Sequence, residues 1–308
     1  MGGRGKTPLV AHLAHKLLRM GERPAILSRG YKRRRPLDGV VVVSDGQRIL
    51  ADLDTSGDEP LMLARALPGV MVFVCDQRAI AGALAEQVYG ATSLILDDGF
   101  QHRSMARDVD IVVVTPDDMR DRRLPFGRLR EPVSALSRAD LIVLDGDGVS
   151  TGSQRGRRSD ENLPTSVPAV TPVFSLDRRL GSPRSLDPAQ PLPDRLSSVV
   201  AVAGIARPAR FVEALTRSGF HVVSSLTFAD HHRYTRDDVS RISDAARASG
   251  ADAVLTTAKD AVRMERLQPF AIPIGVVPLE VSVTPAAAFD HWLATRVSRA
   301  PSGREASG

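Results

Sequence analysis

The sequence opens with a glycine-rich run that ends in lysine and threonine, Gly2-Gly3-Arg4-Gly5-Lys6-Thr7, directly before a helix-like stretch that begins at Pro8. Glycines let backbone amides converge on phosphate oxygens, and the N-terminus of a helix adds partial positive charge. The lysine can reach the outer phosphates of a nucleotide, and the threonine hydroxyl can bind Mg²⁺. The alternative is a disordered glycine-rich terminus, but a Gly-Lys-Thr triplet at a helix start favours a phosphate loop.

A phosphate loop normally follows a strand and begins with one more glycine than this run contains. In this chain both features would precede Met1. We therefore expect the translation start to lie upstream of Met1, with a fragment or a decayed gene as the alternatives.

Two acidic residues follow an apolar run further along the chain. Leu94-Ile95-Leu96 is typical of a buried strand, and Asp97-Asp98-Gly99 follows it directly. A phosphate-loop enzyme needs carboxylates at such a strand end, to hold Mg²⁺ directly or through water. Alone, Asp-Asp-Gly is also common at an ordinary turn; paired with the phosphate loop, it predicts a metal-binding position.

Several charged residues of the first half have both a structural and a catalytic interpretation. Asp58, in Ser56-Gly57-Asp58-Glu59-Pro60, is either a helix cap or a catalytic carboxylate. Arg78 follows another apolar run, where it could neutralise phosphate charge or lie in solvent. The segment 124–132 is rigid and basic and contains Arg130 and Glu131. The segment 28–35 is the densest basic run and, taken alone, reads as a solvated loop.

The second half of the chain carries Asp230-His231-His232 just before a helix-like stretch. Adjacent histidines point in different directions and make a poor metal pair. A single histidine beside a carboxylate either handles a proton, orients a partner, or forms a hydrogen bond at a helix start. Thr256-Thr257-Ala258-Lys259-Asp260 follows a strand-like run. The sequence contains no nucleophile elbow, zinc-ligand spacing or dinucleotide fingerprint.

The elements that must position these residues alternate between short apolar runs and amphipathic stretches, which predicts a mostly parallel sheet covered on both faces. Expected strands in the first half are 40–43, 70–75, 93–96, 111–114 and 141–144, with helices at 8–20 and 77–88. Expected strands in the second half are 198–203, 222–228, 253–257 and 272–277, with helices at 208–218, 235–249 and 285–297. The predicted fold class is α/β, a P-loop NTPase-like sheet flanked by helices with a second, smaller α/β domain.

The predicted domain organisation follows a change in composition after Gly146. Residues 148–170 are rich in glycine, serine, threonine, proline and charge, which is typical of a linker. We therefore expect a P-loop kinase-like domain over 1–147 and a C-terminal α/β domain over 171–308, whose last residues, 298–308, read as a frayed tail.

Composition excludes several classes of protein. Of the 308 residues, 43% are hydrophobic and 25% charged, which excludes a largely disordered chain. A single cysteine excludes a disulfide framework, and no apolar run approaches the roughly 20 residues of a membrane-spanning helix. We expect a cytoplasmic protein or one that lies on a membrane surface.

The charge balance favours anionic partners. The formal net charge is +5, and only four of the 41 basic residues are lysines, Lys6, Lys16, Lys32 and Lys259. Aromatic residues make up 4% of the chain and are not interleaved with the basic runs, which argues against stacking on single-stranded nucleic acid. We expect no nucleic-acid partner.

Taken together and in order, these motifs resemble the tetraacyldisaccharide 4'-kinase family, the lipid A 4'-kinases of Gram-negative bacteria. The resemblance runs from Gly2 to Asp260 and lacks only the family's N-terminal segment. It rests on Gly-Gly-x-Gly-Lys-Thr-Pro, Ser-Arg-Gly-Tyr, Gly-Asp-Glu-Pro, Asp-Asp-Gly-Phe-Gln-His, Gly-x-Leu-Arg-Glu-Pro, Asp-His-His-x-Tyr and Thr-x-Lys-Asp. One departure is Lys32, which stands where the family usually has glycine after Ser-Arg-Gly-Tyr.

The resemblance implies a peripheral kinase on the cytoplasmic face of the inner membrane. It would transfer the γ-phosphate of ATP to the 4'-hydroxyl of a lipid A disaccharide precursor, tetraacyldisaccharide 1-phosphate. The implied catalytic pair is Asp58 and His231. The implied nucleotide-binding residues are Gly2, Gly3, Arg4, Gly5, Lys6, Thr7, Arg78 and Gln101. The implied Mg²⁺ ligands are Thr7, Asp97, Asp98 and Glu131, and the implied substrate-binding residues are Arg29, Tyr31 and Arg130.

Three alternatives stay open at the level of the sequence. Another small-molecule P-loop kinase would differ in its acceptor. An ATP-driven switch would bind a partner protein or nucleic acid through its arginines and hydrolyse ATP without an organic acceptor. Its binding to nucleic acid would weaken steeply with salt. An inactive remnant is the third. Asp58 and His231 favour a kinase, because a switch has no use for a proton acceptor beside a sugar hydroxyl. They lie on opposite sides of the predicted linker, so we expect domain closure to complete the site.

Overall fold

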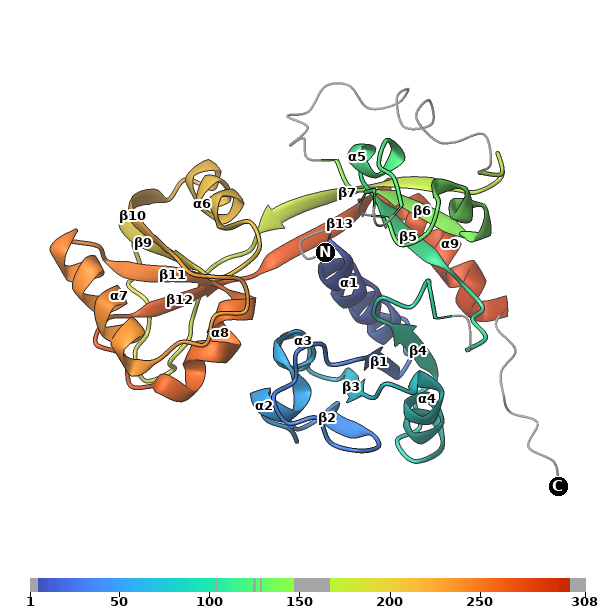
Figure 1. Cartoon of the computed structure of the whole chain (residues 1–308), viewed down its shortest axis with the longest axis horizontal. Helices are drawn as coiled ribbons and strands as arrows, with labels where there is room; N and C mark the ends of the chain where they lie inside the picture. Colours follow the sequence, from blue (N-terminus) through green and yellow to red (C-terminus); the bar gives the residue numbers. More distant parts are fainter. Residues whose placement is uncertain (1–4, 103–104, 124–125, 128, 147–166, 300–308) are drawn as a thin grey trace.

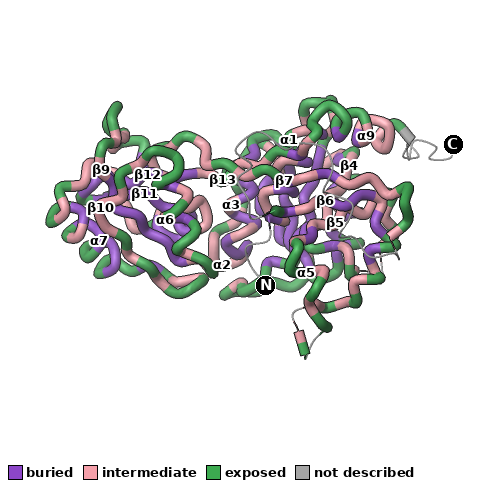
Figure 2. The backbone as a smooth tube through the Cα atoms, turned by 90° about the horizontal axis from the view of Figure 1, so that it is seen from above, coloured by how far each residue is buried: buried purple, intermediate pink, exposed green. Residues whose placement is uncertain are grey.

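The computed structural model describes residues 5–102, 105–123, 126–127, 129–146 and 167–299. Within these ranges the chain forms three sheets with helices packed against them. Two four-stranded sheets lie on either side of helix α1 (Lys6–Arg19), and a five-stranded sheet forms a separate lobe (Figure 1). Buried segments run through the interior of both lobes (Figure 2). The predicted α/β class, with mostly parallel sheets, is confirmed.

The first sheet has the order β2-β3-β1-β4. Strands β1 (Pro24–Ser28), β3 (Met71–Val74) and β4 (Ser93–Leu96) are parallel, and β2 (Val41–Asp45) joins the edge antiparallel to β3. Every residue of β1 and β3 is buried, as continuous apolar runs predict for strands covered on both faces. The associated helices are α2 (Leu53–Ser56), α3 (Asp58–Ala66) and α4 (Arg78–Gln87).

The second sheet has the order β13-β7-β6-β5. Strands β5 (Ile111–Val114), β6 (Leu141–Leu144) and β7 (Val173–Leu180) are parallel, and β13 (Leu279–Thr284) is antiparallel to β7. The short helices α5 (Pro116–Met119) and η1 (Val133–Arg138) and the C-terminal helix α9 (Ala286–Arg299) complete this part. Strands from before and after the predicted linker therefore share one sheet. Most of the linker, 148–166, lies outside the described residues, as do residues 300–308 of the predicted tail.

The third sheet has the order β10-β9-β11-β12-β8. Strands β9 (Ser198–Ala203), β10 (His221–Thr227), β11 (Ala253–Thr257) and β12 (Ile274–Val277) are parallel, and β8 (Arg184–Ser185) is antiparallel to β12. Its helices are α6 (Pro208–Arg217), α7 (Arg236–Ala248) and α8 (Ala258–Met264), with η2 (Glu265–Leu267) after α8. The long ribbon of β7 and β13 connects this lobe to the rest of the molecule (Figure 1).

Helix α1 is the element that joins the first two sheets. Its residues Val10 and Ala14 are buried in a core with β1, β2 and β3, whereas Leu9 and Leu13 are buried in a core with β6, β7 and α9. Burying one leucine side chain contributes about 1.5–3 kcal/mol. Because apolar residues face both ways, the phosphate-loop end of α1 is held between two sheets.

The positions of the candidate functional residues are set by the carboxyl ends of the parallel strands. The carboxyl ends of β1, β3 and β4 lead to Arg29, Arg78 and Asp97, at the edge where α1 begins. In the third sheet, the carboxyl ends of β9 and β11 lead to Gly204 and Ala258. Ligands of open parallel sheets bind outside such carboxyl ends. None of the helices in the described part of the chain is both long enough and apolar enough to cross a bilayer.

Candidate active site

The phosphate-loop residues that the structure describes lie at the start of α1. Gly5 caps the helix with φ +71°, a backbone conformation that favours glycine, and a Cβ there would lie 2.8 Å from side-chain atoms of Leu176 and Arg178 on β7. Lys6 and Thr7 form the first turn of the helix, whose amides are available to phosphate oxygens. Gly2, Gly3 and Arg4 lie outside the described residues.

Asp98 is the centre of a charged group at the end of β4. Its Oδ1 accepts a hydrogen bond from Lys6 Nζ, and its Oδ2 accepts one from Arg130 Nη1 at 3.0 Å. Arg130 Nη1 also lies 3.4 Å from Gln101 Oε1. Partial burial opposes ionisation of Asp98, but the hydrogen bond and charge of Lys6, together with Arg130, hold its pKa below the usual value. The structure thus brings Lys6, Asp98, Gln101 and Arg130 together.

Asp97 has the opposite electrostatic character. Its side chain is buried, and burial, with the nearby charge of Glu59, raises its pKa to about 6. Arg78, which is 2% exposed, donates from Nη2 to the Asp97 carbonyl oxygen at 3.4 Å. Burial, together with the neighbouring charge of Arg29, lowers the pKa of the Arg78 guanidinium. The positive charges around Asp97 therefore do not compensate for the burial of its carboxylate. A bound cation would supply the missing charge, so Asp97 suits the role of a metal ligand.

The metal-binding residues are only partly brought together. Asp97 and Asp98 are adjacent and lie by the start of α1, where Thr7 is found. Glu131 instead pairs with Arg138, whose Nη2 lies 2.6 Å from Glu131 Oε2. Among the described residues, no group of three or more His, Cys, Asp or Glu side chains is arranged to hold a metal ion. A cation here would depend on Thr7, the two aspartates and its own phosphate ligands.

Asp58 and His231 meet at the junction between the first and third sheets. Asp58 begins α3 and His231 lies in the loop before α7, and Nδ1 of His231 is 2.9 Å from Oδ2 of Asp58. Both side chains are largely buried, with 9% and 17% of their surfaces exposed. His231 has φ +65°, so this loop holds it in a conformation that non-glycine residues rarely adopt. The pairing of a carboxylate with an imidazole can hold and move a proton.

Three residues of this junction could not be assigned from the sequence: Glu59, Lys259 and Arg263. Lys259 Nζ lies 3.3 Å from both Glu59 Oε1 and His231 Nε2, and Arg263 pairs with Asp58. Glu59 links the two halves of the site, because its charge also acts on Asp97. Lys259 gave a signal as a rare lysine after a strand. Arg263 follows it at i+4 on the same helix face, but only the fold shows what that face contacts.

Of the three predicted substrate-binding residues, Tyr31 lies at this junction, whereas Arg29 lies near Arg78 and Arg130 lies beside Asp98. The ring of Tyr31 meets the ring of His231 edge-on at 6.2 Å between centroids, while 70% of Tyr31 is exposed. Arg29 is exposed, and its charge acts on Arg78 and His102. Lys32 has φ +60°, the left-handed region that favours glycine. A glycine at this position would adopt the same backbone conformation without strain.

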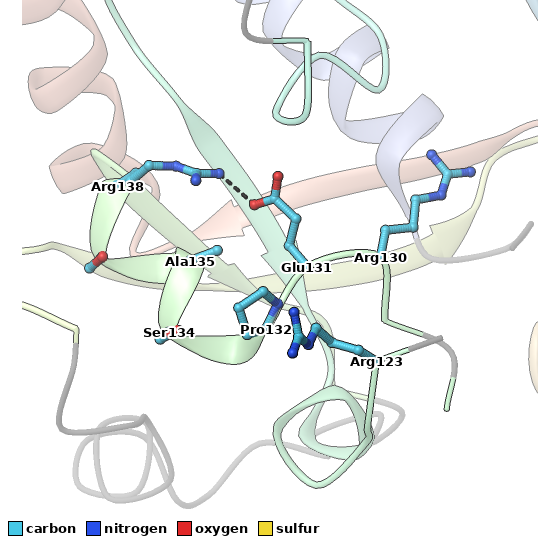
Figure 3. A pocket seen from close by; sticks show the side chains of 8 residues that line it. Arg123, Arg130, Glu131, Pro132, Ser134, Ala135 and Arg138 are labelled. Atoms are coloured by element: carbon cyan, nitrogen blue, oxygen red, sulfur yellow. Dashed lines mark hydrogen bonds and ion pairs between the residues drawn. The ribbon is translucent and has the colours of Figure 1, made fainter. Parts of the chain in front are cut away.

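An arginine-rich pocket of about 450 Å³ adjoins the phosphate side of the site through Arg130. Figure 3 shows Arg138 turned toward Glu131, whereas Arg130 points away from that pair. The lining residues are Arg123, Arg130, Glu131, Pro132, Ser134, Ala135, Ser137 and Arg138. Three arginines and one paired glutamate give the pocket a net positive lining.

Comparison with known proteins assigns this arrangement to a family. The family model of the tetraacyldisaccharide-1-P 4'-kinases, LpxK, matches residues 1–298. The tetraacyldisaccharide 4'-kinase of Syntrophus aciditrophicus is 36% identical over 307 residues, covering 94% of this chain and 80% of that protein. That of Anaeromyxobacter sp. strain Fw109-5 is 40% identical over 277 residues, covering 86% and 71%.

A solved structure agrees with the sequence relatives. The crystal structure of "apo" form LpxK from Aquifex aeolicus in complex with ATP matches with a TM-score of 0.74 and 29% identity. The match covers 96% of this chain and 85% of that chain, which confirms the predicted P-loop kinase fold. The chain belongs to the tetraacyldisaccharide-1-phosphate 4'-kinase family, and its activity is the ATP-dependent 4'-kinase step of lipid A biosynthesis.

Proposed function

We propose that this chain binds ATP at the start of α1 and transfers its γ-phosphate to the 4'-hydroxyl of tetraacyldisaccharide 1-phosphate at the Asp58–His231 junction. The observation that carries the proposal is the hydrogen bond between Asp58 and His231. Glu59, the next residue after Asp58, connects this pair to the phosphate-loop edge, because its charge acts on Asp97. Phosphoryl transfer needs little covalent chemistry from the protein, so positioning and charge neutralisation are its main contributions.

The residues at the phosphate side supply that charge. The amides at the start of α1 and the Lys6 ammonium contact the phosphates, and Gly2, Gly3 and Arg4 remain predicted nucleotide-binding residues. Two arginines lie by the same strand end, since Arg78 donates to the Asp97 carbonyl oxygen and Arg130 donates to the Asp98 carboxylate. Arg130 also contacts Gln101, which supports the prediction that Gln101 binds the nucleotide. Together these residues neutralise charge that develops on the transferred group.

Mg²⁺ fits the donor set of Thr7, Asp97 and Asp98. Oxygen donors are the ligands this ion prefers, and it is usually held by one or two carboxylates together with substrate phosphates. The raised pKa of Asp97 supports the assignment, because a buried carboxylate near Glu59 gains most from a cation. When bound, Mg²⁺ neutralises phosphate charge and orients the γ-phosphate. Glu131 remains a predicted ligand, and it would have to break its ion pair with Arg138 in order to bind the ion.

The acceptor hydroxyl is served by Asp58 and His231. A sugar hydroxyl loses its proton as the new oxygen–phosphorus bond forms, and a paired carboxylate and imidazole can take that proton. The contact already exists in this structure, so any domain closure would act on the entry of substrate rather than on the assembly of the pair.

The acceptor approaches past Tyr31 and Arg29. Tyr31 is exposed, and its ring lies edge-on to His231, so an acceptor seated at the pair would contact this ring. Arg29 and Arg130 remain predicted to bind the anionic groups of the substrates. The exposed side chains Lys32, Arg34, Arg35 and Leu37 continue from Tyr31. Basic and apolar side chains around the entrance suit an anionic membrane surface, and we place the enzyme on the cytoplasmic face of the inner membrane.

The test is transfer of labelled γ-phosphate from ATP to detergent-dispersed tetraacyldisaccharide 1-phosphate, with the position of the new phosphate determined by mass spectrometry of the sugar fragments. Lys6→Ala should abolish transfer. Lys16→Ala is the matched control, because Lys16 lies on the same helix but pairs with Asp290. ATP hydrolysis without phosphate on the lipid would instead support the ATP-driven switch, and absence of both reactions would support an inactive remnant.

A further inference from the structure

Arg263 is a buried guanidinium that joins the catalytic carboxylate to the third sheet. It lies on α8, and 4% of its side chain is exposed. Nε donates to Asp58 Oδ2 at 3.0 Å, and Nη2 donates to the same oxygen. Nη1 donates to the Gly204 carbonyl oxygen at 3.0 Å and to Asp260 Oδ1 at 3.1 Å. All three nitrogens are therefore committed, and the planar group has no freedom to leave Asp58.

A second layer of buried polar groups fixes Arg263 from behind. Asp260 is fully buried, and its Oδ1 accepts from the Tyr234 hydroxyl at 3.0 Å and from Gly204 N at 3.1 Å. Its Oδ2 accepts from Thr257 Oγ1 at 2.7 Å. A Cβ at residue 204 would lie 2.9 Å from Asp260 Oδ1, so glycine permits this close approach. Such fully satisfied buried networks hold one geometry.

Arg263 determines what Asp58 can do. The three donors on Oδ2 are His231 Nδ1, Arg263 Nε and Arg263 Nη2, and Oδ1 accepts from Glu59 N at 3.1 Å. Burial opposes ionisation of Asp58, but the charge of Arg263, with those of Lys259 and His231, outweighs it and holds the pKa of this carboxyl below its usual value. A carboxylate in these surroundings is a weak proton acceptor but a strong orienting group.

The remaining atom of the pair is Nε2 of His231. Because Asp58 is ionised, Nδ1 of His231 is the donor in the 2.9 Å contact. Lys259 Nζ lies 3.3 Å from Nε2, and an ammonium group can only donate, so Nε2 presents its lone pair. Asp230 also faces this side of the ring, and Lys259 bonds Glu59 as well. With Nδ1 as the donor to Asp58, the lone pair of Nε2 can accept a proton from a hydroxyl group that takes the place of Lys259.

We propose that Arg263 is a positioning residue for phosphoryl transfer: it holds the Asp58 carboxylate on His231 Nδ1 and so fixes the orientation of the pair. The inference rests on the proposed function of the Asp58–His231 pair. As the acceptor oxygen bonds to the γ-phosphorus, its O–H bond breaks and the proton goes to the Asp58–His231 pair. The bond from the γ-phosphorus to the bridging oxygen breaks at the same step, and ADP takes that electron pair.

The experiment compares the pH profiles of kcat for Arg263→Gln and Arg263→Lys in full-length protein, with ATP and tetraacyldisaccharide 1-phosphate as substrates. Arg263→Gln should lower kcat about 10- to 100-fold and move the acidic limb of the profile upward by about one pH unit, because removing the positive charge beside Asp58 favours the protonated form of the Asp58–His231 pair. KM for ATP should stay unchanged. Arg263→Lys keeps the charge, so its limb should stay near that of the wild type while kcat falls.

Arg65→Gln is the matched control. Arg65, on α3, forms an ion pair with Glu265 on η2, so it joins the same two parts of the molecule without touching Asp58. If Arg263 only links the two parts structurally, Arg65→Gln and Arg263→Gln should change the unfolding temperature equally. Neither variant should then shift the acidic limb of the pH profile of kcat. That outcome would overturn the proposal. A kcat of Arg263→Lys equal to that of the wild type would also overturn it, and this second measurement decides the question if Arg263→Gln does not fold.

Failure of the underlying function is distinguishable from failure of this inference. If Asp58→Ala and His231→Ala retain full turnover, the role of the pair itself is wrong. If both lose turnover while Arg263→Gln keeps the wild-type limb, only the role of Arg263 is wrong.

Discussion

Nδ1 of His231 lies 2.9 Å from Oδ2 of Asp58, although 173 residues separate them in the sequence. Asp58 begins α3 beside the first sheet, and His231 lies in the loop after the carboxyl end of β10 in the third sheet. The contact unites two parallel sheets at the edges where such sheets bind ligands. Glu59 and Lys259 then connect this contact to the phosphate side.

The buried carboxylate of Asp97 should be a source of instability without metal. Its pKa is raised to about 6, above its unfolded value, so its ionised form at neutral pH disfavours the folded state. We expect Asp97→Asn to raise the unfolding temperature in EDTA, to abolish the stabilisation that Mg²⁺ and ATP add, and to lower kcat at least 100-fold. Differential scanning fluorimetry with and without Mg²⁺–ATP measures the first two effects.

The control for Asp97 is Asp76→Asn, because Asp76 also follows a strand of the first sheet but has 78% of its side chain exposed. That change should leave both temperatures within one degree of the wild type, by the weak effects of exposed charges. Equal stabilisation of Asp97→Asn and wild type by Mg²⁺–ATP would argue against Asp97 as a metal ligand.

His12 should make the protein less stable as the pH falls. Burial, with the charge of Lys16, lowers its pKa to about 4, below the roughly 6.5 of an unfolded chain. The folded state therefore favours the neutral ring. Stability is complete above about pH 6.5 and is lost progressively as the pH falls toward 4, because the unfolded chain takes up the proton first. We expect His12→Gln to flatten the urea-unfolding free energy between pH 7 and pH 5.

His15→Gln is the comparison for His12, since His15 lies one turn away on α1 with an exposed side chain. Its variant should change the pH dependence less than His12→Gln does, because His15 acts on His12 only through its charge. A slope that is the same in His12→Gln and wild type would show that other groups produce it.

The left-handed backbone of Lys32 should cost stability. At φ +60°, a residue with a Cβ costs about 1 kcal/mol relative to glycine. We expect Lys32→Gly to raise the free energy of unfolding by up to about 1 kcal/mol, and Lys32→Ala to leave it unchanged, because alanine keeps the strained Cβ. Chemical denaturation of the three proteins measures this difference, and greater stability of the alanine variant would contradict it.

The sequence predicted most of the fold because the strands are continuous apolar runs. Ser93–Leu96, Ile111–Val114 and Leu141–Leu144 are strands with the predicted bounds. Strand β7 was not predicted, since Val173–Leu180 mixes apolar with charged residues, and its buried positions depend on the pairing with β6 and β13. The contribution of β7 to the second sheet could therefore be seen only in the fold.

The candidate site divides in the same way. The phosphate loop and Asp97–Asp98 form local motifs, so their chemistry could be inferred from adjacent residues. Asp58 and His231 could be paired only through the family resemblance. Arg263 had no signal at all, because its meaning comes from Asp58, 205 residues away. Long-range polar contacts of this kind depend on how two sheets are placed relative to each other, and local sequence patterns do not predict that placement.

The measurement that tests the account most directly is single-turnover transfer of phosphate from ATP to tetraacyldisaccharide 1-phosphate by Asp58→Ala and His231→Ala at saturating substrates. General acid–base groups contribute about 10²- to 10⁴-fold. We expect a rate loss in that range for each variant with unchanged ATP affinity. The double variant should lose little more, because the two residues act as a unit.

His232→Ala is the control, because the adjacent histidine bonds Asp238 at 2.9 Å instead of Asp58. It should transfer phosphate within about threefold of the wild-type rate, since general acid–base catalysis would not pass through it. If Asp58→Ala or His231→Ala transfers phosphate as fast as this control, the contact between Asp58 and His231 is structural and the central claim is wrong.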